Sequence, residues 1–218
     1  MSVQTRIDIL VKSVESSLIL MAGESGTSKE TLTTRYIEDG ISKGETVLVV
    51  LFAHSAADYI EKLKSEITGL QTHIDTGKVH FIDSLSYRSI PEEKTKNTFF
   101  LEHASDLLTL SVTINELSLK ASKLRIVFDQ LAILMLYNKP MQVLNFLQTL
   151  AARIRQRKQS ALLILDSGVI DDQTENTLHT IVDMVVETKR TDDPEGIQQL
   201  VRIKFAKSEF EPRWVQVL

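Results

Sequence analysis

The sequence contains no cysteine, so disulfide bonds and thiolate metal sites are excluded. It has only eight glycines and four prolines, which argues against a linker-rich or low-complexity chain. No apolar run approaches the ~20 residues that a membrane helix needs. Residues 1–15 also lack the apolar core of a signal peptide. We therefore expect a cytoplasmic protein that does not enter a membrane.

An excess of charge of either sign is also missing. The chain carries 25 lysines and arginines against 29 aspartates and glutamates, a net charge of −4. Nucleic-acid binding is therefore not expected, because phosphate backbones attract domains with a basic excess. The 218 residues, of which 43% are hydrophobic, are enough for one α/β domain spanning 1–218, whereas two domains would be small.

Short apolar runs alternate with longer amphipathic segments along the chain. Runs typical of buried parallel strands occur at 17–22, 45–52, 78–83, 124–129 and 160–166. Helical periodicity is found at 29–42, 55–67, 98–122, 140–158 and 174–182, and residues 84–97 form a polar surface loop. The end of the chain predicts a hairpin of 183–190 and 197–207, with a last strand in the tail. Together these elements predict one mixed, mostly parallel sheet with helices on both faces.

The stretch "GESGTSKET" at residues 23–31 directly follows the first predicted strand. It approximates the phosphate-loop pattern G-x-x-x-x-G-K-S/T, whose backbone N–H groups wrap an anion at a helix N-terminus. The residues predicted to bind phosphate are Gly23, Gly26, Thr27, Ser28, Lys29 and Thr31. The same small residues are also common in an ordinary strand–turn–helix connection, so both interpretations remain open.

Two positions of the loop depart from the pattern. Ser28 replaces the second glycine, and its Cβ restricts a backbone that often needs freedom there. Glu30 replaces the hydroxyl residue that normally holds Mg²⁺. At ~4 Å from a phosphate, its charge would cost roughly 4 kcal/mol at an effective dielectric of 20. Thr31 comes one residue late, so its side chain points about 100° further round the helix.

Acids and a histidine follow the other predicted strands. Asp129 ends the strand at 124–129 and is the candidate Mg²⁺ ligand, although an acid here can also simply cap the next turn. The second strand is followed by Ala53 and His54, where His54 is either a catalytic base near neutral pH or a structural residue. Asp166 ends the strand at 160–166, where its charge has the wrong sign for a phosphate.

Two groups of basic residues have open interpretations. The first group ends the helix at 140–158 and consists of Arg153, Arg155, Arg157 and Lys158. It is either a solvated helix C-terminus, which the helix dipole favours, or a contact with a subunit or nucleic acid. In the hairpin, Arg202 and Lys204 share one face and Lys207 points the other way. Such cations either protect a sheet edge from aggregation or reach the phosphates of a neighbouring subunit.

The stretches 17–52, 124–134, 159–172 and 181–210, taken in this order, resemble the KaiC-like branch of the RecA superfamily of phosphate-loop ATPases. The resemblance implies a RecA-like three-layer αβα sandwich with a mostly parallel central sheet and a C-terminal β-hairpin. It implies ATP and Mg²⁺ as ligands, and a homo-oligomer or a paralogous KaiC/RecA-like subunit as partner. Lys204 matches the lysine of the family's Lys-x-Arg pair, which reaches the adjacent subunit's nucleotide, whereas Ala206 stands at the arginine.

The sequence agrees with this family in the order of its strands, loop and helices. It departs from the family at the positions that carry the chemistry. These departures are Ser28, Glu30, Ala53, His54 and Ala206. They favour a degenerate nucleotide site and a regulatory or interaction pseudo-ATPase in which ATP and Mg²⁺ binding is weakened. The alternative is an active, divergent ATPase in a signalling or DNA-repair-related assembly. It would use Lys29 and Asp129, with Thr31 or a water in place of the missing hydroxyl. A DNA-recombination accessory protein is a third hypothesis, and the lack of a basic excess argues against it.

Overall fold

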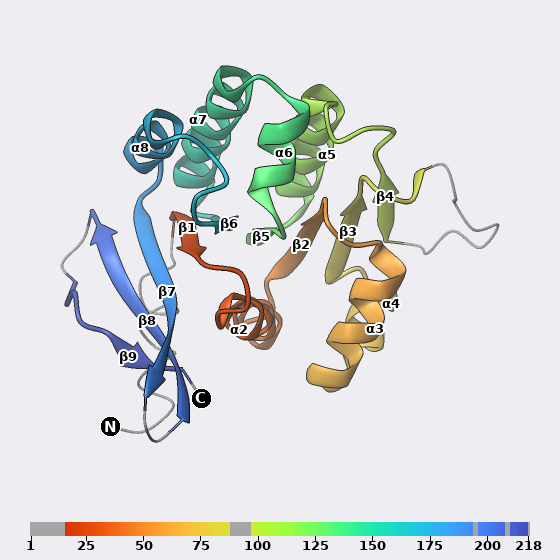
Figure 1. Cartoon of the computed structure of the whole chain (residues 1–218). Coiled ribbons are helices and arrows are strands. Elements are labelled where there is room, and N and C mark those ends of the chain that lie inside the picture. The colour runs from red at the N-terminus through yellow and green to blue at the C-terminus, as the bar shows by residue number, and fades with distance from the viewer. Residues whose placement is uncertain (1–15, 88–96, 194–195, 208–209, 218) are drawn as a thin grey trace.

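The computed structural model describes residues 16–87, 97–193, 196–207 and 210–217. Its centre is a nine-stranded sheet with the order β4-β3-β2-β5-β6-β1-β7-β8-β9 (Figure 1). The strands are β1 Leu18–Gly23, β2 Thr46–Leu51, β3 Val79–Asp83, β4 Thr98–Phe100, β5 Leu124–Phe128, β6 Ser160–Asp166, β7 Met184–Asp193, β8 Gly196–Ala206 and β9 Val215–Gln216. Neighbouring strands from β4 to β7 pair in parallel, and β8 and β9 are antiparallel additions. The predicted mostly parallel sheet is confirmed.

Helices cover both faces of this sheet. They are α2 Lys29–Ser42, α3 Ala56–Glu66, α4 Leu70–Asp75, α5 Leu107–Lys120, α6 Leu131–Tyr137, α7 Pro140–Arg157 and α8 Asp172–Ile181. Figure 1 shows α2, α3 and α4 on one face and α5 to α8 on the other. The result is the three-layer αβα sandwich that the sequence predicts.

The central strands are buried on both faces, which explains why their sequences are nearly continuous apolar runs. In β2, Val47 and Val49 belong to the core cluster beneath α2 and α3. Leu48 and Val50, which alternate with them, belong to the cluster beneath the helices of the other face. All four side chains are completely buried.

The parallel pairing brings several chain segments to one edge of the sheet. Strands β2, β5, β6 and β1 are consecutive neighbours, so their carboxyl ends lie together. Gly23 at the end of β1 is the register partner of Asp166 at the end of β6. Ligands of open α/β sheets bind outside these carboxyl ends. The edge therefore positions the loop after β1 together with the residues that follow β2, β5 and β6.

The predicted helix over 98–122 is wrong in its first part. Residues Thr98–Phe100 form β4, which pairs with β3 at the sheet edge. The helix α5 begins only at Leu107, where the Asp106 side chain accepts a hydrogen bond from the Thr109 N–H. Pairing with β3 is a long-range contact that helical periodicity does not report. The short helices α4 and α6 were also not predicted, and most of the predicted loop at 84–97 lies outside the described residues.

The predicted hairpin is confirmed as β7 and β8, and the tail adds β9 to its outer edge. Just before β9, the Trp214 ring lies 4.3 Å from the Lys189 Nζ and 4.5 Å from the Arg202 guanidinium carbon. These cation–π contacts hold the tail on the hairpin. Among the described helices, none combines the length and apolar character needed to cross a membrane.

Candidate functional site

The loop between β1 and α2 is shaped by its contact with β7. A Cβ added to Gly23 would lie 2.0 Å from the Thr188 Oγ1 and 2.5 Å from the Thr188 carbonyl oxygen, so only glycine fits. The Thr27 hydroxyl donates to the Glu24 carbonyl at 2.8 Å and lies 2.7 Å from the Thr188 hydroxyl. Gly26 has φ +78°, the left-handed conformation that glycine tolerates best. Packing and turn geometry thus account for three of the predicted phosphate-binding residues.

Lys29 begins α2, as predicted, and its ammonium group is turned into the protein. Its Nζ donates to the carbonyl oxygens of Gly23 at 2.5 Å and Glu24 at 2.7 Å. It also lies 2.6 Å from the Asp166 Oδ1, and its side chain is only 7% exposed. A lysine ammonium has three N–H donors. All three are therefore directed at groups of the protein itself.

Asp166 is held from several sides. Its Oδ2 accepts from the Ser25 hydroxyl at 2.9 Å and from the Gln130 amide at 3.4 Å. Partial burial alone would raise the pKa of this carboxyl, but the hydrogen bonds from Lys29 and Ser25 outweigh it and lower the pKa. Asp166 is therefore ionised at neutral pH and balances the charge of Lys29.

The side chains of the remaining loop residues do not converge on a common point where a metal ion could bind. Ser28 is buried at the N-cap of α2, and its Oγ has no hydrogen-bond partner among the described residues. The Glu30 carboxylate pairs with the Lys62 ammonium of α3 and is 75% exposed, so its predicted repulsion of a phosphate is reduced. Thr31 is exposed on the outside of α2, one position past the usual hydroxyl.

Asp129 ties the end of β5 to the turn after β2. Its Oδ1 accepts from the Phe52 N–H at 2.7 Å, and its Oδ2 accepts from the Ala53 N–H at 3.1 Å. The His54 Nδ1 lies 3.1 Å from the same Oδ2, and the Asp129 side chain is only 3% exposed. Each oxygen of the predicted Mg²⁺ ligand thus accepts a hydrogen bond from the turn after β2, which is far from Asp129 in the sequence and is not the next turn of the chain.

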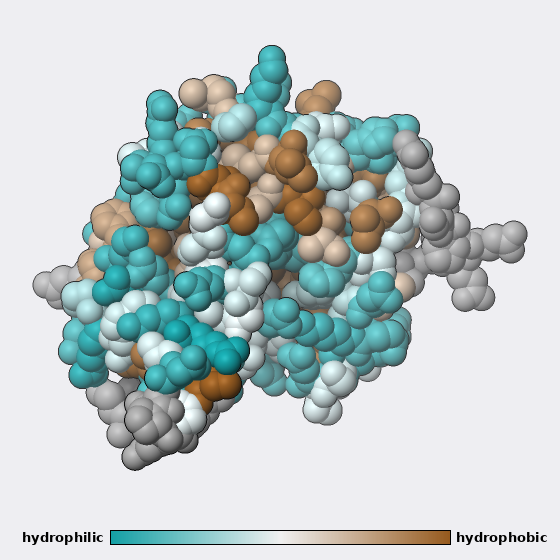
Figure 2. Space-filling model, viewed as in Figure 1, coloured by the Kyte–Doolittle hydropathy of each residue, from teal (hydrophilic) through white to brown (hydrophobic). Residues whose placement is uncertain are grey.

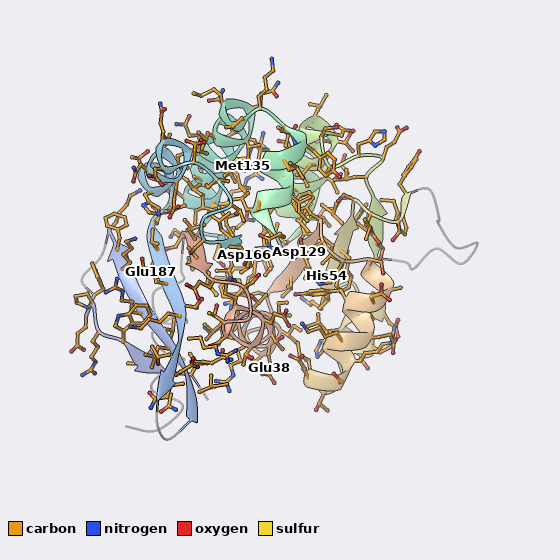
Figure 3. All side chains as sticks on the ribbon, viewed as in Figure 1. Glu38, His54, Asp129, Met135, Asp166 and Glu187 are labelled. Carbon is orange, nitrogen blue, oxygen red and sulfur yellow. The ribbon has the colours of Figure 1, made fainter. Side chains whose placement is uncertain are left out.

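His54 is half-exposed at the mouth of the site. The hydrogen bond to Asp129 is the main cause of a raised pKa for His54, and it outweighs the opposing effect of partial burial. Figure 3 shows that Asp166, Asp129 and His54 lie in a row at neighbouring strand ends, above α2. The carboxylate fixes the imidazole, so the Nδ1–H donates to Asp129.

These strand ends enclose a cavity of about 200 Å³, which is below the roughly 300–1,000 Å³ of typical ligand sites. The residues around it include Ser25, Lys29, His54, Lys62, Asp129 and Asp166. Figure 2 shows a polar surface at the strand ends and an apolar area above it, over α6. Within the described residues, no group of three acidic or histidine side chains is arranged to hold a metal ion. In this arrangement the Lys29 ammonium and the Asp129 carboxylate both make their contacts with groups of the protein itself.

The hairpin residues lie apart from this cavity. Arg202 and Lys204 share a face, as predicted, and both pair with Glu187 of β7, at 2.6 Å and 2.7 Å. Burial alone would raise the pKa of Glu187, but these two cations outweigh it and lower the pKa. Figure 3 shows Glu187 on the hairpin, separated from the row of strand-end residues. A contact of Lys204 with a neighbouring subunit stays a prediction.

The three arginines of the basic cluster at the end of α7 make contacts within the domain. Arg153 and Arg157 both reach α5, at the hydroxyls of Ser111 and Ser118. Arg155 faces the other way and lies 2.8 Å from the Asp183 carboxylate. This confirms the predicted arrangement on the helix and favours the structural interpretation for these three arginines.

Sequence reasoning found Lys29, His54, Asp129 and Asp166, which the structure brings together, but missed their partners. Gln130, which bonds Asp166, and Lys62, which pairs with Glu30, cannot be singled out from the sequence, because each is an ordinary polar residue in its segment. The sequence shows the sign of the charge at Asp166 but not its ion pair with Lys29. That pair joins residues distant in sequence, and only the pairing of β1 with β6 reveals it.

Comparisons with known proteins agree with the fold. A family model of KaiC ATPases matches residues 10–206. The crystal structure of a KaiC-like protein from the hyperthermophilic archaeon Pyrococcus horikoshii OT3 superposes with a TM-score of 0.67 at 15% sequence identity. The match covers 93% of this chain and 85% of that chain. At this identity the likeness concerns the fold alone. A search of curated proteins finds no significant match.

Proposed function

Since this chain belongs to the KaiC ATPase family, we propose that it is a regulatory or interaction subunit whose nucleotide site does not hydrolyse ATP efficiently. One observation carries this proposal. Both oxygens of Asp129 accept hydrogen bonds from the turn after β2, and the side chain is almost completely buried. An ATPase of this class needs that carboxylate to hold Mg²⁺.

The other groups required for hydrolysis support the same conclusion. The position after Lys29 carries Glu30, whose carboxylate is paired with Lys62 rather than directed at the loop. The turn after β2 carries Ala53 in place of an acid. A positioned base typically contributes ~10²–10⁴-fold to a rate. Losing the metal ligand and the acid together is therefore expected to bring turnover far below the usual enzyme range.

The alternative, an active divergent ATPase, is favoured by a different observation. The Asp129 carboxylate fixes the His54 ring through its Nδ1–H, at the strand end where a base is expected. An imidazole held in this way can accept a proton from water at its other nitrogen. This function would require a turnover that depends on His54.

We also propose that the protein assembles with a second copy of itself or with a paralogous KaiC/RecA-like subunit. Exposed apolar residues near α6 support an interaction role, since contiguous apolar surface often marks protein contacts. They are Leu136, Tyr137, Met141 and Val169. Light scattering of the purified protein, alone and mixed with the paralogue, measures the assembly. A strict monomer in both samples would contradict it.

Steady-state hydrolysis of Mg·ATP tests the catalytic part of the proposal. We expect turnover well below the ~1 s⁻¹ that marks the lower end of ordinary enzymes. Lys29→Ala is the control, because it separates activity of this site from a contaminating ATPase. Turnover of about 1 s⁻¹ or more that Lys29→Ala abolishes would refute the proposal. If His54→Ala abolishes it as well, the active alternative takes its place.

A further inference from the structure

We propose that Asp166 is an internal occupant of the anion site, where its carboxylate binds Lys29 and Ser25 in place of a phosphate and keeps the loop closed to free anions. This inference rests on the proposed function, because an efficient ATPase could not keep its loop closed in this way. It goes further by naming the group that takes the place of the ligand.

The first argument is the number of donors that Lys29 has available. Its ammonium bonds two carbonyl oxygens of its own loop, those of Gly23 and Glu24, and the Asp166 carboxylate. A free anion must therefore displace one of these three partners. Asp166 is the partner that carries a negative charge, so an anion competes with it most directly.

The second argument is that the sheet places this carboxylate beside the loop. Gly23 and Asp166 are register partners in β1 and β6. The next residue, Ser167, donates its N–H to the Gly23 carbonyl oxygen at 3.0 Å. The backbone therefore holds Asp166 at the start of the loop, and its ion pair with Lys29 is not a chance contact between flexible surface chains.

The third argument is the shape of the contact. One oxygen of Asp166 faces Lys29 at 2.6 Å, and the other accepts from the Ser25 hydroxyl of the loop at 2.9 Å. A carboxylate bridging a lysine and a loop hydroxyl uses the same kinds of donor that a phosphate oxygen would use. One backbone donor at the end of the loop is also engaged internally, since the Lys29 N–H donates to the Thr27 carbonyl at 2.7 Å.

The test uses inorganic phosphate as the probe, at constant ionic strength, with binding followed by NMR chemical-shift titration of the full chain. We expect very weak binding by the wild-type protein and a gain of at least about tenfold for Asp166→Asn. Tenfold corresponds to ~1.4 kcal/mol, the low end for one hydrogen bond to a charged group. Adding Lys29→Ala to Asp166→Asn is expected to remove the gain. Asp166→Ser is a second variant in case the amide disturbs folding, which thermal unfolding reports.

Glu30→Gln is the matched control. It removes the same charge from the same cavity, but Glu30 pairs with Lys62 rather than with Lys29. A gain for Glu30→Gln as large as that for Asp166→Asn would overturn the inference, because it would reflect general electrostatics. If the wild type and both Asp166 variants bind phosphate equally and show no ATP turnover, this inference is overturned but the proposed function is not. Lys29-dependent ATP turnover by the wild type would instead refute the proposed function.

Discussion

Removing the Asp129 carboxylate tests whether this residue is structural or a metal ligand. Asp129→Ala takes away the acceptor of the Phe52 N–H, which is partly buried and has its bond at 2.7 Å. A buried donor left without a partner costs ~1–3 kcal/mol. The bond from Ala53 is exposed and can be replaced by water, and the half-exposed contact with His54 adds less than about 1 kcal/mol.

The sum lies between about 1 and 4 kcal/mol, which for a domain of this size lowers Tm by roughly 2–16 °C. The assay is thermal unfolding by circular dichroism, without nucleotide and without divalent metal. His54→Ala is the control, because it removes only the exposed partner and is expected to lower Tm far less. A Tm for Asp129→Ala within about 2 °C of the wild type, together with Mg²⁺ stabilisation of the wild type alone, would show that Asp129 serves a metal instead.

Three further predictions concern other contacts. The pKa of His54 is raised in the folded protein, so its stabilising effect is complete below about pH 6 and is lost as pH rises through the raised value. The Tm difference between wild type and His54→Ala should therefore shrink towards about pH 9, and a constant difference would contradict this. Gly23→Ala forces a Cβ against Thr188 and should cost ~1–3 kcal/mol, with partial recovery by Thr188→Ala, as measured by urea unfolding. Arg125→Ala removes a buried cation that two carboxylates share and should cost ~3–5 kcal/mol; a loss below about 1 kcal/mol would show that water replaces it.

The strand, turn and helix that form the site could be predicted, because their order depends on residues that are neighbours in the sequence. The apolar run that forms β1 is followed by small residues and then by Lys29, and this order predicts strand, turn and helix without knowledge of the fold. The acids at 129 and 166 were placed correctly at strand ends for the same reason. The partners of these two acids could not be predicted, because they come from segments that are distant in the sequence.

The two acids at the loop show the difference most clearly. Glu30 and Asp166 both have the wrong sign for a phosphate, and the sequence does not distinguish their effects. In the structure, Glu30 faces Lys62 at the surface, whereas Asp166 pairs with the buried Lys29. The effect of each charge on the loop is decided by its distance and burial, which are tertiary properties.

Buried Arg125 gives a second example at another part of the sheet. It is the second residue of the otherwise apolar strand β5, is only 2% exposed, and pairs with Asp39 and Glu45. Gly40 of α2 makes room for it, since a Cβ there would lie 2.7 Å from the Arg125 Cδ. A sequence pattern predicts a buried strand here but does not show that a cation lies within it.

The alternation of strands and helices, the position of the loop and the identity of the charges near it can all be predicted from the amino-acid sequence. These features follow from side-chain periodicity and turn chemistry, which act over a few residues. Three features depend on tertiary contacts: residues 98–100 form a strand, Asp129 bonds the turn after β2, and Asp166 neutralises Lys29. Strand pairing and ion pairing join residues that are far apart in the chain, and their free energy depends on a distance that local patterns do not contain.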